Sequence, residues 1–290
     1  MLELWTKDKE TEFFTEALNL STPEKLFYLT NNSRYYAYWP KTYKGSKSTL
    51  QSRNAFIGDF TEKYSMNLLQ SYAQSKGLHA IQGVACRELD LTRQSPADIA
   101  ICRTKGKEQS AKDIVAIFEV KMSVVWNWEL RNHQLICLGD FTTHKGTPGL
   151  LRSDSMLKAI GKSVDIRVTG HYASQIPIVI LGNTPIMQSY ITKVDNLKEA
   201  GIIQGFWSVN PNPLDGDVKN LKNTPRNGFI RMDSYYELEQ NLERLVSGER
   251  EFLSCWISKN ELGKIIETAN QEKGLEKKAE KLLLLIRSQK

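Results

Sequence analysis

The sequence contains few cysteines, and none of the four is spaced for metal binding. Cys86, Cys102, Cys137 and Cys255 form no CxxC pair and match no zinc-ribbon spacing. We therefore expect reduced, buried thiols rather than a zinc site or a disulfide framework.

Long apolar runs and nucleotide-binding loops are also missing. The longest apolar run near the C-terminus, Leu282 to Ile286, is too short to span a bilayer, and residues 1–10 are charged and polar. No Walker-type lysine loop, GxGxxG turn, GxSxG elbow or Cys-His pair stands out. These absences exclude nucleotide hydrolysis, dehydrogenase and serine-hydrolase chemistry, and they favour a cytoplasmic protein without a membrane segment.

The composition is that of an ordinary globular protein. The 290 residues are 40% hydrophobic and 25% charged. Lysine and arginine exceed aspartate and glutamate, 39 to 33, which gives a formal charge of +6. This excess mildly favours a polyanionic partner.

Helical and strand patterns alternate through the middle of the chain. We expect a helix from Asp59 to Ser75, because Phe60, Tyr64, Leu68 and Tyr72 recur at every fourth position. Three strands should follow, then a helix, a strand, a helix and a strand. The expected ranges of these seven elements are 80–89, 99–102, 114–122, 155–164, 176–182, 187–200 and 202–209.

The pattern predicts an α/β fold, with a mixed central sheet flanked by helices and a helical C-terminal region. Residues 1–54 form an N-terminal region that includes an aromatic and basic arm, 29–53, without periodic apolar residues. Residues 55–210 form the core. Residues 211–290 begin with a proline- and asparagine-rich segment and continue as helices that we expect to pack with the core.

Two charged residues end the apolar strand 114–122, IVAIFEVKM. Side chains alternate between the faces of a strand, so Glu119 and Lys121 share one face while Phe118 and Val120 share the other. Charges at the end of a buried strand are costly unless they are paired or bind a metal. We therefore expect a compensating group nearby.

A second carboxylate is expected opposite Glu119. Asp98 begins the preceding strand, and a polar segment, 104–112, joins the two strands as a hairpin loop. Antiparallel pairing centred on that loop places Asp98 nearly opposite Glu119. Facing carboxylates repel each other, and a hard divalent cation would make the arrangement favourable.

These residues resemble the motif of the PD-(D/E)XK nucleases. Pro96 and Asp98 are followed by Glu119-Val120-Lys121, although Ala97 separates the proline from the aspartate. The expected order of elements over 59–182 is similar to the αβββαβ core of that superfamily. The chain is most similar in size and layout to type II restriction endonucleases.

The resemblance implies a role for each residue. Asp98, Glu119 and the carbonyl of Val120 would hold Mg²⁺, for which Mn²⁺ can substitute, and Lys121 would orient the attacking water or lower its pKa. Glu62, on the first core helix, is the candidate for an additional acid. Glu88 competes with it, whereas Glu129 should lie outside the site.

Two segments offer candidate DNA contacts. The aromatic and basic arm can contact phosphates and stack on bases, or it can simply pack onto the core. The start of the second core helix can bind phosphate. The candidate residues are Arg34, Tyr35, Trp39, Lys41, Lys44, Lys47, Ser153, Lys158 and Lys162.

A rival metal site is His133, Asp140 and His144. Asp140 and His144 are four residues apart, as neighbours on a helix would be, but Gly139 and two threonines disfavour a helix there. We consider this set much weaker than the D…ExK motif.

Function is expected to be Mg²⁺-dependent, sequence-specific cleavage of double-stranded DNA by a homodimer. A repair, recombination or structure-selective nuclease is the alternative within the same class. A noncatalytic DNA-binding protein, which keeps the acids for structure, and a small-molecule α/β enzyme are the alternatives from other classes.

Overall fold

The computed structural model describes residues 3–45, 50–216, 220–247 and 259–288. The chain divides into two compact units, Met1–Gly248 and Glu249–Lys290. In the second unit, α8 (Lys259–Asn270) and α9 (Leu275–Arg287) pack against each other. The region expected over 211–290 is therefore divided between the two units.

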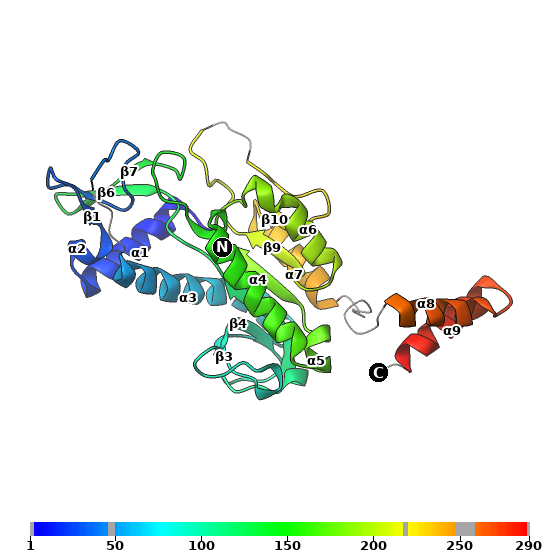
Figure 1. Ribbon diagram of the computed structural model, residues 1–290. Coiled ribbons are helices and arrows are strands. Elements are labelled where there is room, and N and C mark those ends of the chain that lie inside the picture. The colour runs from blue at the N-terminus through cyan, green and yellow to red at the C-terminus, as the bar shows by residue number, and fades with distance from the viewer. Residues whose placement is uncertain (1–2, 46–49, 217–219, 248–258, 289–290) are drawn as a thin grey trace. The chain divides into compact units, whose positions relative to one another are not determined.

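The first unit is built on a mixed six-stranded sheet, in the order β10-β9-β8-β5-β4-β3. Figure 1 labels β3, β4, β9 and β10 of this sheet. Neighbours among β3, β4 and β5 are antiparallel, and neighbours among β5, β8, β9 and β10 are parallel. The strands are β3 (His79–Val84), β4 (Ala97–Cys102), β5 (Ile114–Val120), β8 (Ile178–Gly182), β9 (Gly205–Ser208) and β10 (Phe229–Arg231). The prediction of an α/β fold with a mixed central sheet is confirmed.

Helices cover both faces of this sheet. One face, which carries Phe118 and Leu181, shares an apolar core with α1 (Lys7–Leu20), α3 (Gln51–Ser75) and α7 (Tyr235–Ser247). The opposite face, which carries Ile117 and Ile180, packs against α4 (Ser153–Val168), α5 (His171–Gln175) and α6 (Ile191–Glu199). Every residue of β8 is buried, as expected for a uniformly apolar strand between two helical layers.

Part of the aromatic and basic arm, 29–53, in which no periodic apolar pattern indicated a strand, belongs to a second, smaller sheet. Its strand order is β1-β2-β6-β7, formed by β1 (Tyr28–Leu29), β2 (Tyr35–Tyr36), β6 (Asn127–Arg131) and β7 (Gln134–Gly139). A short helix, α2 (Pro23–Leu26), precedes β1. Pairing of β2 with β6 joins segments about a hundred residues apart, so no local pattern indicates it.

Several predicted boundaries were wrong. Helix α3 begins at Gln51 rather than at Asp59, and Arg53 and Ile57 in its added turns are buried. The strand expected to reach residue 89 ends at Val84 and is followed by a short 3₁₀ turn. The proline-rich segment leads into β10, a strand that was not predicted.

None of the helices in the described ranges combines the length and the apolarity that crossing a bilayer requires.

Candidate active site

The register between β4 and β5 brings the two predicted carboxylates together. Ile99 lies opposite Phe118 and Ala100 opposite Ile117, so the next position in this register places Asp98 opposite Glu119. Asp98 Oδ2 accepts a hydrogen bond of 2.8 Å from the backbone N–H of Val120. The antiparallel register predicted from the hairpin is confirmed.

Three oxygen atoms converge on the ammonium of Lys121. Its Nζ lies 2.6 Å from Glu119 Oε1, 3.1 Å from the carbonyl oxygen of Val120 and 3.5 Å from Asp98 Oδ2. These oxygens belong to the three groups expected to hold the metal. A cation therefore already lies among them.

Lys162 contacts the same carboxylates through their other oxygens. Its Nζ, which extends from α4, lies 3.1 Å from Asp98 Oδ1 and 2.6 Å from Glu119 Oε2. This residue was predicted to contact DNA, but the structure places it in the acidic pair. The sequence carried no signal for this contact, since α4 follows β5 by more than thirty residues.

Burial and charge oppose each other at this cluster. Burial raises the pKa of Glu119 and the charge of Asp98 raises it further, while Lys121 and Lys162 lower it, and the net pKa is raised. Burial lowers the pKa of Lys162, but the two carboxylates raise it more, so the ammonium is the stable form at neutral pH. The lysines therefore provide the compensating charge that was expected near Glu119.

Of the three additional acids considered, only Glu62 lies near the carboxylate pair. It accepts a hydrogen bond of 3.0 Å from Gln82 of β3. Burial raises the pKa of Glu62, the Gln82 bond lowers it, and the charge of Asp98 raises it, with a raised pKa as the result. Glu88 instead accepts a bond from the N–H of Ala111 in the loop between β4 and β5.

Glu129 lies outside the site, as expected. It is buried on β6, and both of its carboxylate oxygens accept hydrogen bonds from Arg34, at 2.6 and 2.7 Å. Arg131 adds a further bond of 2.8 Å. These ion pairs connect Arg34, which precedes β2, with β6 and so stabilise the second sheet.

Asn183 supports the site and was not among the predicted residues. Directly after β8, its buried amide donates to the carbonyl of Ser123 at 2.7 Å and accepts from the Ser123 N–H at 3.1 Å. This two-point contact holds the chain just beyond Lys121. A polar residue that ends a fully apolar strand was the available signal.

The oxygen-only donor set fits a hard divalent cation. Each carboxylate oxygen of Asp98 and Glu119 lies within 3.5 Å of a lysine ammonium, so a cation is already favoured at all of them. Glu119 Oε1, Asp98 Oδ2 and the Val120 carbonyl, which all lie around the Lys121 ammonium, give the small set of oxygens that Mg²⁺ takes from protein while keeping several waters. Within the described ranges, no group of three or more His, Cys, Asp and Glu side chains is arranged to hold a metal ion.

The predicted DNA contacts in the arm are mostly engaged within the protein. Trp39 is buried and stacks between Tyr28 and Tyr43, with centroid distances of 4.5 and 4.1 Å. Arg34 pairs with Glu129, as described above, and the Tyr35 hydroxyl donates to Glu24. The faces of Trp39 are thus covered by protein rings and cannot stack on bases in this conformation.

The basic residues of the arm and of α4 are more available. Lys41 and Lys44 are exposed, whereas Lys47 lies outside the described residues. Lys158 is exposed on α4, one turn before Lys162, and the Ser153 hydroxyl lies 2.9 Å from that of Tyr190.

The rival metal set does not assemble. His133 is exposed in the turn between β6 and β7, and it has a left-handed φ of 60°. His144 is buried, and its ring nitrogens lie 3.0 Å from the N–H of Gly146 and 3.3 Å from the carbonyl of Val125. Both nitrogens of His144 are therefore engaged with the backbone.

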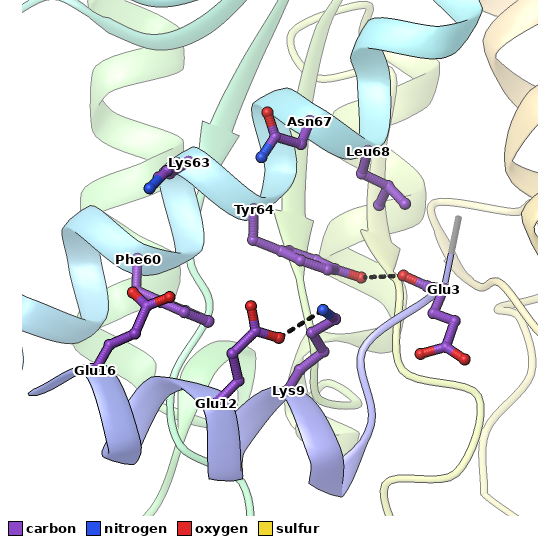
Figure 2. A pocket seen from close by; sticks show the side chains of 9 residues that line it. All are labelled: Glu3, Lys9, Glu12, Glu16, Phe60, Lys63, Tyr64, Asn67 and Leu68. Carbon is purple, nitrogen blue, oxygen red and sulfur yellow. Dashed lines mark hydrogen bonds and ion pairs between the residues drawn. The ribbon is translucent and has the colours of Figure 1, made fainter. Parts of the chain in front are cut away.

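A cavity of about 320 Å³ lies elsewhere, between α1 and α3 (Figure 2). Its wall includes Glu12, Glu16, Lys63 and Tyr64, and the Tyr64 hydroxyl donates to the carbonyl of Glu3. None of the residues of the carboxylate cluster line it. Its rim carries charges of both signs and gives no indication of a particular ligand.

Comparison of the chain with protein-family models, with curated proteins and with solved structures finds no match.

Proposed function

We propose that the protein is a Mg²⁺-dependent endonuclease that cleaves double-stranded DNA in a sequence-specific manner. The observation that carries this proposal is the convergence of Asp98, Glu119 and the Val120 carbonyl on the ammonium of Lys121. Two acids, a carbonyl and a lysine at the ends of adjacent strands are what the D…ExK resemblance implies. The formal charge of +6 also suits a polyanionic substrate.

Each residue has a chemical role in this proposal. Asp98, Glu119 and Val120 would hold the ion, which when bound would supply polarisation of the phosphate and activation of water. Lys121 stabilises negative charge at the reacting phosphate and orients the attacking water through its N–H donors. Glu62, whose pKa is raised in part by the charge of Asp98, would be the additional acid beside the ion.

The proposed partner is DNA that a homodimer engages through its exposed lysines. Lys41, Lys44 and Lys158 are exposed, and in this proposal they would contact phosphates rather than bases. A twofold homodimer suits a palindromic site, because the symmetry of the protein then matches that of the DNA.

One observation favours a second candidate, a noncatalytic DNA-binding protein. Every oxygen of Asp98 and Glu119 lies close to an ammonium, so the cluster is already neutralised without a metal. In that case the acids would support the fold only. The protein would bind DNA with a strong dependence on salt and leave it uncut in Mg²⁺ and Mn²⁺.

Digestion of a mapped plasmid tests the proposal. Discrete, reproducible fragments in Mg²⁺ support a restriction-type enzyme, whereas progressive degradation or cutting only at junctions indicates a repair or structure-selective nuclease. Glu119→Gln and Lys121→Met should be inactive. Glu108→Gln, at the far end of the β4–β5 hairpin, is the matched control and should cut like the wild type.

A further inference from the structure

The acidic pair is flanked by cations on two sides. Lys121 approaches Glu119 Oε1 and Asp98 Oδ2, and Lys162 approaches Glu119 Oε2 and Asp98 Oδ1. Each lysine thus bridges the two carboxylates through a different pair of oxygens. Two-metal hydrolases hold their ions roughly 3.5 to 4 Å apart, so that both ions act on the same phosphate.

The two sides are not equivalent. On the Lys121 side the Val120 carbonyl adds a third oxygen, 3.1 Å from Nζ. On the Lys162 side the described contacts of Nζ are the two carboxylate oxygens alone. A divalent ion gains more protein ligands on the Lys121 side, since hard cations prefer several oxygens.

Lys162 is anchored more firmly than a surface lysine. It extends from the middle of α4, whose neighbouring residues Ala159, Ser163 and Ile166 are buried against the sheet. Its side chain is 23% exposed and contacts both carboxylates. Displacing it would leave Glu119, which is 5% exposed, without its second cation.

Electrostatics also disfavour two ions. With both lysines protonated, one divalent ion gives the cluster a formal charge of 2 + 2 − 2 = +2, counting two ammoniums and the carboxylates of Asp98 and Glu119. Two divalent ions would give 4 + 2 − 2 = +4 in a partly buried site. A phosphodiester group carries a single negative charge, which offsets the first arrangement far better.

We infer that the site holds one divalent ion per chain, on the Lys121 side, and that the Lys162 ammonium takes the position of a second ion. In that position Lys162 faces the same phosphate as the ion and offsets its developing negative charge. This inference rests on the proposed function for the identity of the phosphate, but its ion count can be measured without DNA.

Binding of Mn²⁺ to the full chain, followed by electron paramagnetic resonance and calorimetry, tests the inference. The wild type should bind one ion per chain, and Asp98→Asn should lose it. Lys162→Met should bind the ion at least roughly tenfold more tightly, because a neighbouring positive charge is removed.

Lys162→Glu should bind two Mn²⁺ ions per chain, and the resonance spectrum should show the magnetic coupling of two ions that lie close together. Lys158→Met, one turn away on α4, is the matched control and should bind Mn²⁺ like the wild type.

Two ions on the wild type would overturn the inference, as would a single ion on Lys162→Glu or unchanged affinity in Lys162→Met. The number of bound ions and the nuclease activity are tested by separate measurements, so either hypothesis can be refuted without the other. A wild type that binds one Mn²⁺ and leaves DNA uncut refutes the proposed function alone. A wild type that cuts DNA with two bound ions refutes only the assignment of Lys162.

Discussion

Asp98 Oδ2 accepts a hydrogen bond of 2.8 Å from the N–H of Val120, so the carboxylate on β4 is tied to the backbone of β5. This bond gives Asp98 a structural role besides its proposed role as a metal ligand. The two roles can be separated by substitution, because an asparagine oxygen can still accept the bond while an alanine cannot.

Asp98→Asn should fold like the wild type and lose DNA cleavage by roughly a hundredfold or more, since a charged ligand is removed from the reaction centre. Asp98→Ala should be equally inactive and less stable than Asp98→Asn by about 1 kcal/mol. Urea denaturation compares the two variants. Equal stabilities of the two variants would show that the hydrogen bond to Val120 does not stabilise the fold. Full activity in Asp98→Asn would show that Asp98 is not a metal ligand in the reaction.

Asn183→Ala should lower both stability and cleavage. The substitution removes the Asn183 partner from both the N–H and the carbonyl of the half-buried Ser123, at a cost of about 1 to 3 kcal/mol. Loosening of the segment after Lys121 should reduce kcat more than it raises KM, because ground-state contacts to DNA remain. Asn223→Ala, at an exposed position, is the control. A variant with wild-type kcat would contradict the positioning role.

Glu10 is a fully buried carboxylate at the centre of the N-terminal packing. It accepts hydrogen bonds from the indoles of Trp5 and Trp128 and from the N–H groups of Val125 and Trp126. Glu10→Gln would direct an amide N–H₂ at some of these donors and should cost about 2 to 4 kcal/mol of folding free energy.

The exposed Glu12→Gln, on the same helix, should change stability by less than about 0.5 kcal/mol. Chemical denaturation of both variants is the measurement. Similar small losses in the two would show that the four N–H contacts to Glu10 are not stabilising.

His144 predicts a pH dependence of stability. It stacks on Tyr38 with a centroid distance of 3.9 Å, and burial lowers its pKa from 6.5 to about 4. A depressed histidine pKa means that the unfolded chain takes up a proton first, so the stabilisation present above pH 6.5 is lost as the pH falls toward 4.

His144→Phe keeps a ring against Tyr38 but does not titrate. Its stability relative to the wild type should therefore improve as the pH is lowered from 7 to 5, as followed by urea denaturation. Asn132→Gly, at an exposed left-handed position that glycine tolerates, removes no titratable group and should show no such trend. A constant difference between His144→Phe and the wild type would contradict the depressed pKa.

The pairing of Asp98 with Glu119 could be predicted because a hairpin loop fixes the register of its strands, and side-chain alternation then fixes the faces. The contact of Lys162 with these two carboxylates could not be predicted, because it depends on how α4 lies over the sheet. The stacking of Trp39 was equally hidden, since it requires the second sheet, whose strands are far apart in sequence. Local sequence patterns thus predicted the two carboxylates, whereas the contact with Lys162 depends on tertiary packing.

Replacing Mg²⁺ by Fe²⁺ and generating hydroxyl radicals at the bound ion would locate the metal directly. The backbone should be cut near Asp98 and near Glu119 to Lys121, Mg²⁺ in excess should suppress both cuts, and Glu119→Gln should lack them. Cuts confined to other parts of the chain, or an unchanged pattern in Glu119→Gln, would show that these oxygens do not hold a divalent ion.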